Sequence, residues 1–235
     1  MKIVTAASLL VTLLFLSPSS LFAQSGSSSG SSTKQNENVT ILFDGKSLDH
    51  FRGYKSEKIG KGWKIDGDSL MFDGSGGGDL MTKEKYTDYE LMFEWKVTEG
   101  ANSGVMYRVT TGDNAPYLSG PEFQILDDAK HRDGKKETTS AGSLYALYVP
   151  EGKKTKPVGE WNSAKITHKG NLIEHWLNGK KVVSAEIGSD DWNKRVANSK
   201  FKNWKKFGAS QSGHIALQDH GNKVWFRNIK IKTMK

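Results

Sequence analysis

The stretch that decides the fold runs from Asp88 to Val97 and reads Asp-Tyr-Glu-Leu-Met-Phe-Glu-Trp-Lys-Val. Apolar and polar residues alternate along it with a period of two. Because successive side chains of an extended strand point to opposite faces, this period predicts a half-buried β-strand rather than a helix.

The same alternation recurs on both sides of this stretch, in short segments separated by turn signals. Asn178-Gly179 lies between two such segments and is a strong hairpin signal. About ten short strands with no βαβ spacing favour two packed antiparallel sheets, an all-β sandwich. The other predicted strands cover residues 39–43, 103–109, 121–126, 143–148, 164–168, 172–177, 181–187, 214–219 and 224–232.

One segment, from Ser189 to Phe201, has the pattern of a short helix. Ser189 is a suitable N-cap, two acidic residues follow it, and Trp192 and Val196 are spaced i, i+4. We expect a short surface helix that covers an edge of the sandwich.

Composition limits the function classes. The chain has 235 residues, 36% hydrophobic and 26% charged, which suits one soluble globular unit. It has no cysteine, which excludes disulfides, thiolate metal sites and a lipoprotein anchor. The net charge of +8 is dispersed among acidic residues, with no dense basic tract. We therefore expect no nucleic-acid partner.

The N-terminus resembles a secretory signal peptide. Lys2 provides the positive charge, an apolar run follows from Ile3 to Leu16, and Ala23 ends a small-residue cleavage site. The alternative, a retained anchor, is disfavoured because the run is too short to span a bilayer. We expect an exported protein, periplasmic or extracellular, with no membrane insertion after cleavage. We expect the Ser/Gly-rich residues 24–38 to be a flexible linker and the folded domain to cover residues 39–235.

Several predicted strands carry unusual polar residues on one face. Alternation places Arg108 with Asn102 opposite the apolar residues of its strand, and the same holds for Glu122 and Gln124, and for Gln218 and His220. We expect Arg108, Glu122, Gln124, Gln218 and His220 to share one hollow. The alternative is an ordinary solvated sheet face.

Carboxylate, amide, guanidinium and imidazole groups together suit the recognition of sugar hydroxyls. Aromatic rings such as Tyr145, Trp161 and Trp176 suit stacking against pyranose faces. An oligosaccharide or other glycoside is therefore the expected partner. A non-catalytic carbohydrate-binding module would use the same features and is the competing function class.

Seven strings, in order from Ile41 to the C-terminus, resemble the 3-keto-disaccharide hydrolase family. They are residues 41–48 (Ile-Leu-Phe-Asp-Gly-Lys-Ser-Leu), 102–104 (Asn-Ser-Gly), 120–127 (Gly-Pro-Glu-Phe-Gln-Ile-Leu-Asp), 159–162 (Gly-Glu-Trp-Asn), 175–179 (His-Trp-Leu-Asn-Gly), 215–221 (Ile-Ala-Leu-Gln-Asp-His-Gly) and 226–229 (Phe-Arg-Asn-Ile). The resemblance implies a secreted bacterial protein with a concanavalin A-like jelly-roll sandwich. It also implies cleavage of glycosides whose glucose unit is already oxidised at C3.

A ketone at C3 acidifies the proton on C2, so elimination of the C1 substituent followed by hydration can cleave the bond. These steps need a base, an acid for the leaving oxygen and a cradle for the enolate. We expect Glu122 or His220 as the base, Arg108 as the enolate stabiliser, and Asp127 or His131 as the acid. The expected substrate-binding residues are Asn102, Gln124, Tyr145, Trp161 and Gln218.

A conventional laminarinase-like mechanism is the alternative enzyme hypothesis. Residues 122–127 are similar to the Glu-x-Asp-x-x-Glu strand of those glycosidases, but Gln124 replaces the middle Asp and Asp127 the final Glu. A retaining pair needs carboxyl groups about 5–5.5 Å apart, and Asp127 reaches less far than Glu. This departure favours keto-assisted cleavage.

We expect no cofactor and no metal. Calcium at Asp127, Asp128 and Asp133 is the main alternative, against a simple loop rich in turn formers. His131 and His175 are two further candidate ligands, although a structural role is favoured for His175. The glycine-rich run at residues 74–78 lacks the residues of a phosphate-binding loop and predicts a loop at the cleft rim.

Overall fold

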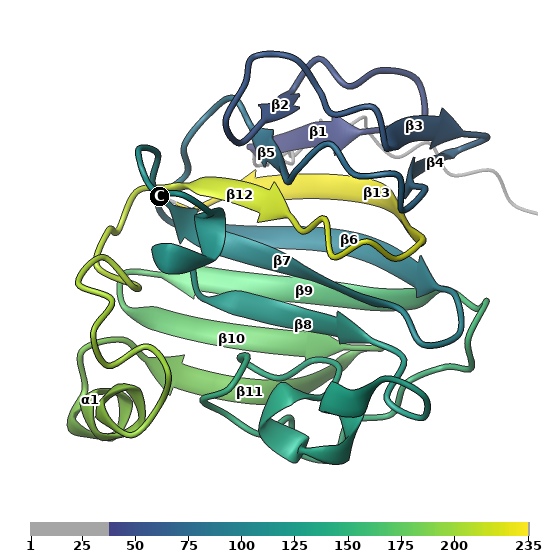
Figure 1. Cartoon of the computed structure of the whole chain (residues 1–235). Coiled ribbons are helices and arrows are strands. Elements are labelled where there is room, and N and C mark those ends of the chain that lie inside the picture. The colour runs from purple at the N-terminus through teal and green to yellow at the C-terminus, as the bar shows by residue number, and fades with distance from the viewer. Residues whose placement is uncertain (1–37, 235) are drawn as a thin grey trace, which may run out of the picture. The chain divides into compact units, whose positions relative to one another are not determined.

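The computed structural model describes residues 38–234. Two antiparallel sheets pack face to face, the smaller in front of the larger in Figure 1. The all-β sandwich prediction is therefore confirmed. The predicted signal peptide and all of the predicted linker except Asn38 lie outside the described residues.

The larger sheet has eight strands in the order β11-β10-β9-β6-β13-β4-β3, with β1 also paired to β13. Its strands are β1 (Val39–Phe43), β3 (Trp63–Asp66), β4 (Ser69–Phe72), β6 (Tyr89–Val97), β9 (Asn162–Lys169), β10 (Leu172–Leu177), β11 (Lys180–Glu186) and β13 (Val224–Thr233). The smaller sheet has the order β2-β5-β12-β7-β8. Its strands are β2 (Phe51–Gly53), β5 (Leu80–Thr82), β7 (Asn102–Val109), β8 (Glu122–Leu126) and β12 (His214–Leu217).

The alternation of β6 explains how the two sheets hold together. Every second residue from Tyr89 to Val97 is buried, and the residues between them are half-buried on the outer face. Phe93 meets Phe123 of β8 across the core, with ring centroids 5.7 Å apart. Burial of such side chains is the main favourable term for packing one sheet on the other.

The strands differ from the prediction in two places. Residues 143–148 form no regular strand, because Ala146 has a φ of 60° and Leu147 N–H bonds to Leu144 O within a turn. The segment instead lies against β8 as a loop, where Tyr145 N–H donates to Glu122 O. Strands β2 to β5 were not predicted, because three or four residues are too few to show a period of two.

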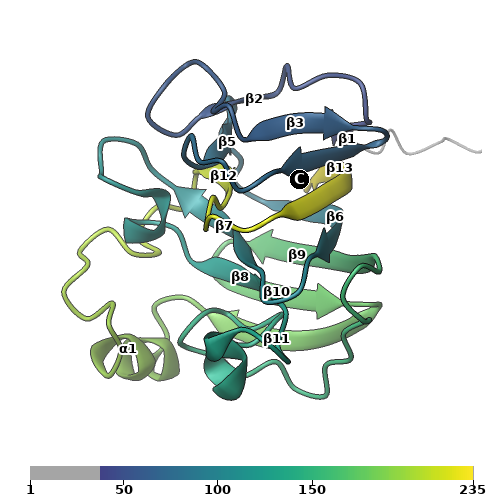
Figure 2. The same cartoon turned by 45° about the vertical axis from the view of Figure 1, so that its right-hand side comes forward.

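The short helix is confirmed as α1 (Asp190–Ala197), and it lies beside β11 in both views (Figures 1 and 2). The Ser189 hydroxyl accepts from Trp192 N–H, which caps the first turn. Trp192 is buried and stacks on Phe207, with centroids 5.9 Å apart. The chain after α1 is therefore fixed to the sandwich on its way to β12. Three 3-10 turns complete the fold: η1 (Pro116–Leu118), η2 (Arg132–Lys135) and η3 (Glu137–Thr139).

Between residues 38 and 234, no helix has the length and hydrophobicity that a bilayer-spanning helix needs.

Candidate active site

The outer face of the smaller sheet carries a cleft whose floor is set by strand register. Gly104 of β7 pairs with Gln124 of β8, and Gln218 N–H donates to Gly104 O at 2.9 Å. Two residues along the strands, and so on the same face, Met106 pairs with Glu122. The predicted gathering of Glu122, Gln124 and Gln218 on one surface is therefore correct.

Loops from distant parts of the chain form the walls. The cleft has a volume of about 160 Å³. Its walls come from η1, from the loop after η3, from the segment between α1 and β12, and from the chain after β12. The lining residues are Asn102, Tyr117, Gly120, Glu122, Gln124, Tyr145, Lys200, Phe201, Phe207, Gln218 and His220.

Glu122 is the acidic residue that lines the cleft. It is only 7% exposed, and burial raises the pKa of its carboxyl to about 8, although the Lys200 ammonium opposes the shift. Asp79 and Asp133 raise the pKa further through their negative charges. At neutral pH the Glu122 carboxyl therefore holds its proton most of the time.

Three amides present oxygen acceptors at the floor. Asn102 Oδ1, Gln124 Oε1 and Gln218 Oε1 are buried and have no hydrogen-bond partner within the described part of the chain. Gln124 Nε2 donates to Thr139 O at 3.2 Å, which orients that side chain. Buried polar atoms are almost always paired in folded proteins. The three acceptors in this cleft are therefore available to the hydrogen-bond donors of a ligand or of water.

Lys200 and Tyr145 form a cation–π contact at the wall of the cleft. Lys200 Nζ is 4.3 Å from the centroid of the Tyr145 ring, and Tyr145 Oη donates to Asp133 Oδ2 at 3.2 Å. Tyr145 was predicted as a binding residue, whereas Lys200 was not. Lys200 follows α1 in a lysine-rich segment, and no local pattern distinguishes it from its neighbours.

His220 lines the cleft as predicted, and His131 stands next to it. Their ring centroids are 6.0 Å apart. His131 Nδ1 accepts from Asp133 N–H at 3.1 Å, and burial lowers the pKa of His131. The neutral His131 ring therefore carries its proton on Nε2.

Arg108 does not lie in the cleft, so the predicted hollow lacks its guanidinium. Its φ of 57° and a register shift between β7 and β12 reverse the side-chain alternation at this point. The buried guanidinium turns inward, where Nε donates to His168 Nε2 at 2.7 Å and Nη1 donates to Gly208 O at 2.8 Å. Arg108 also donates to Gly170 O in the turn between β9 and β10.

Asp127 also lies outside the cleft. Its carboxylate accepts from Gly100 N–H at 2.7 Å and from Ala129 N–H at 3.1 Å, so it holds two turns together. It lines a separate depression at the end of the sandwich. The expected role of Asp127 as the leaving-group acid in this cleft is therefore wrong. The alternative laminarinase-like pair of Glu122 and Asp127 does not form either.

Trp161 belongs to the opposite side of the molecule, so its predicted stacking role in this cleft is wrong. Its neighbours Lys96 and Arg227 lie on β6 and β13 of the larger sheet, with Lys96 Nζ 4.8 Å from the Trp161 ring centroid. Trp176 also faces outward from that sheet, beside Lys165. The aromatic rings at the cleft are instead Tyr117, Tyr145, Phe201 and Phe207.

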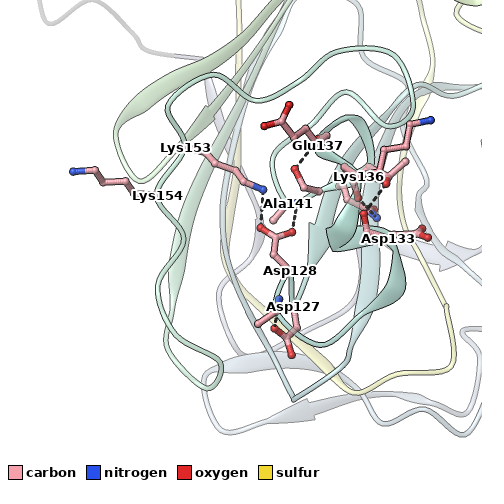
Figure 3. Close-up of polar contacts among 12 residues, drawn as sticks. Asp127, Asp128, Asp133, Lys136, Glu137, Ala141, Lys153 and Lys154 are labelled. Carbon is pink, nitrogen blue, oxygen red and sulfur yellow. Dashed lines mark hydrogen bonds and ion pairs between the residues drawn. The ribbon is translucent and has the colours of Figure 1, made fainter.

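The carboxylates considered for calcium have separate partners (Figure 3). Asp128 binds Lys153 Nζ at 2.6 Å and accepts from Ala141 N–H at 2.8 Å. Asp133 instead accepts from Tyr145 Oη at 3.2 Å. No cluster of three metal-binding side chains occurs within residues 38–234. His175 is fully buried between Tyr107 Oη, at 2.9 Å, and Gly142 O, as a structural histidine.

Asp79, next to the start of β5, is an acid near the site that no sequence pattern indicated. Its Oδ1 accepts from Asp219 N–H at 2.9 Å, and burial raises its pKa to about 6. The glycine-rich run before it forms a loop, as predicted. Gly78 N–H donates to Asp219 Oδ2 at 3.0 Å and so joins this loop to the chain next to His220.

Comparison with known proteins identifies the family. The model of the 3-keto-alpha-glucoside-1,2-lyase-like domain matches residues 38–232. The chain belongs to this family. A 3-keto-disaccharide hydrolase of Bacteroides thetaiotaomicron is 36% identical to this member over 225 residues, 82% of this chain and 77% of the relative.

Solved structures agree with this assignment. A candidate glycosyl hydrolase from Parabacteroides distasonis superposes on this family member with a TM-score of 0.78 and 34% identity, over 84% of this chain and 95% of the other. A second from the same organism has a TM-score of 0.68 and 29% identity, over 83% and 99%. An endo-β-1,3(4)-glucanase, 7% identical with a TM-score of 0.50, shares the fold alone. The family match, the Bacteroides relative and the two Parabacteroides structures support a carbohydrate hydrolase.

Proposed function

We propose that this protein cleaves 3-keto-glucosides or 3-keto-disaccharides by keto-assisted elimination and hydration. The observation that carries the proposal is the buried Glu122 carboxyl, protonated near neutral pH, next to amide oxygens that lack partners among the described residues. The name of the 36% identical relative supports the choice of 3-keto substrates. The amides supply the hydroxyl recognition that a sugar needs.

The residues at the cleft divide naturally among the steps. His220 removes the C2 proton, which the C3 ketone has made acidic, and the electrons form an enolate. The Lys200 ammonium stabilises the enolate oxygen, the role that sequence alone assigned to Arg108. Glu122 donates its proton to the departing glycosidic oxygen as the bond from C1 breaks. Water then adds at C1, C2 regains a proton, and free 3-keto-glucose is released.

This assignment explains why the cleft presents a single protonated acid rather than a carboxylate pair. A retaining glycosidase needs a carboxylate nucleophile about 5–5.5 Å from its acid. The expected partner, Asp127, is bound to two backbone N–H groups outside the cleft. Elimination needs no carboxylate nucleophile, because the ketone supplies the activation.

The test compares a 3-keto-glucoside with its unoxidised counterpart, using wild-type protein and Glu122→Gln. We expect release of 3-keto-glucose from the oxidised substrate only, and a loss of about 10²- to 10⁴-fold in the variant. Cleavage of both substrates at similar rates would contradict keto assistance. Binding of both without cleavage by the wild type would instead identify a lectin-like module.

We also propose that the protein is exported, on the basis of the sequence of residues 1–23. Expression of the full chain in a Gram-negative host should give a protein that begins at Gln24 in the periplasm or medium. An intact N-terminus in the cytoplasm would contradict export.

A further inference from the structure

Exposure differs widely among the residues that line the cleft. Asn102, Glu122 and Gln124 at the floor are between 0% and 7% exposed, whereas Tyr117 at the wall is 44% exposed. The proposed acid therefore lies deep, and Tyr117 stands where the cleft opens to solvent.

The volume of the cleft limits what it can enclose. Pockets for drug-sized ligands typically measure about 300–1,000 Å³. At about 160 Å³, this cleft suits one sugar ring. If the oxidised glucose ring occupies the floor among the amides, a leaving group attached at C1 must extend toward the mouth.

An aromatic pair stands at this mouth. Tyr117 and Trp204 have ring centroids 5.7 Å apart, and Trp204 packs edge-on against Phe201 at 5.0 Å. Tyr117 lines the cleft, whereas Trp204 contacts the Tyr117 ring and is not one of the lining residues.

The two loops that carry these rings are fastened to each other. Lys206 Nζ binds Asp113 Oδ1 at 3.0 Å, and Gly208 N–H donates to Ser119 O at 2.8 Å. Asp113 and Ser119 flank Tyr117, and Lys206 and Gly208 follow Trp204 in sequence. The Tyr117–Trp204 pair is thus held in place before a ligand binds, which lowers the entropic cost of binding.

We propose that Tyr117, supported by Trp204, forms a subsite that stacks against a ring in the leaving group. The ligand class is a 3-keto-glucoside with a cyclic aglycone, either a second pyranose or an aromatic ring. A pyranose offers an apolar C–H face and an aryl group a π-face, and both pack against tyrosine. This inference rests on the proposed function.

The experiment measures kcat/KM for three 3-keto-glucosides, with a methyl, a phenyl or a glucosyl aglycone. Tyr117→Ala should lower the value about 2- to 10-fold for at least one ring-bearing substrate and leave the methyl substrate within twofold of wild type. Tyr117→Phe, which keeps the ring, should have a kcat/KM close to that of wild type for every substrate. Ile65→Ala on β3, which removes a similarly exposed side chain, should affect none of the substrates.

The outcomes separate the subsite from the proposed function. A loss confined to the phenyl or to the glucosyl substrate identifies the preferred ring, and either result supports the subsite. Equal losses for all three substrates, or no loss for any, would overturn it. If wild-type protein cleaves none of the three, the proposed function fails and the subsite fails with it.

Discussion

Gly104 lies directly against the side chain of Glu122 on the neighbouring strand. A Cβ atom at Gly104 would come within 2.6 Å of Glu122 Cδ. Gly104 does not have a positive φ, so close approach rather than backbone conformation requires glycine here. The Glu122 carboxyl therefore holds its place over the strand because residue 104 has no side chain.

Gly104→Ala should separate activity from stability. The methyl group would meet the end of a flexible side chain, so the fold can adjust while the Glu122 carboxyl moves. We expect kcat/KM for a 3-keto-glucoside to fall about 10²-fold or more, with a melting temperature close to that of wild type. Unchanged activity would show that the observed position of Glu122 is not needed.

The matched control is Gly67→Ala in the turn between β3 and β4. Gly67 has a φ of 62°, and a Cβ atom there would meet none of the described atoms within 4 Å, so alanine is strained but displaces nothing. It should lower stability by about 1 kcal/mol and leave kcat/KM unaltered.

The pH dependence of kcat/KM should follow the Glu122 carboxyl. If the protonated form acts as the acid, kcat/KM falls as pH rises through about 8, the pKa to which burial raises this group. Lys200 holds that pKa down by its positive charge, so Lys200→Met should move the falling limb to higher pH. A limb that stays in place in Lys200→Met would argue against this charge coupling.

Glu122 should also make stability depend on pH. Its folded pKa of about 8 lies above its ordinary value of 4.5, so the folded state binds the proton more tightly. The resulting stabilisation is complete below about pH 4.5 and is lost as pH rises through about 8. The melting temperature of Glu122→Gln minus that of wild type should therefore be several degrees larger at pH 9 than at pH 4.5. A constant difference across this range would contradict burial of the charge.

Arg108 should act on stability rather than on chemistry. Its guanidinium satisfies His168 and the carbonyls of Gly170 and Gly208, and Gly208 follows the loop that carries Lys200. Arg108→Met leaves these acceptors unpaired and should cost about 3 kcal/mol or more in urea denaturation. Loss of activity at wild-type stability would restore the catalytic role that the sequence suggested.

Much of this architecture could be predicted from alternation, because burial on one face imposes a period of two. The same rule placed Glu122, Gln124 and Gln218 together correctly. It failed at Arg108, where a positive φ reverses the alternation, a feature that no residue type in Met106-Tyr107-Arg108 announces. It also could not place Lys200, Tyr117 or Asp79, because loops reach the cleft through tertiary packing rather than local pattern.

The most direct test of keto-assisted cleavage is the fate of the C2 hydrogen when wild-type protein cleaves a 3-keto-glucoside in D₂O. Elimination followed by hydration predicts deuterium at C2 of the released 3-keto-glucose, beyond the exchange of free 3-keto-glucose under the same conditions. Product that retains its original C2 hydrogen would show direct displacement at C1 and contradict the mechanism.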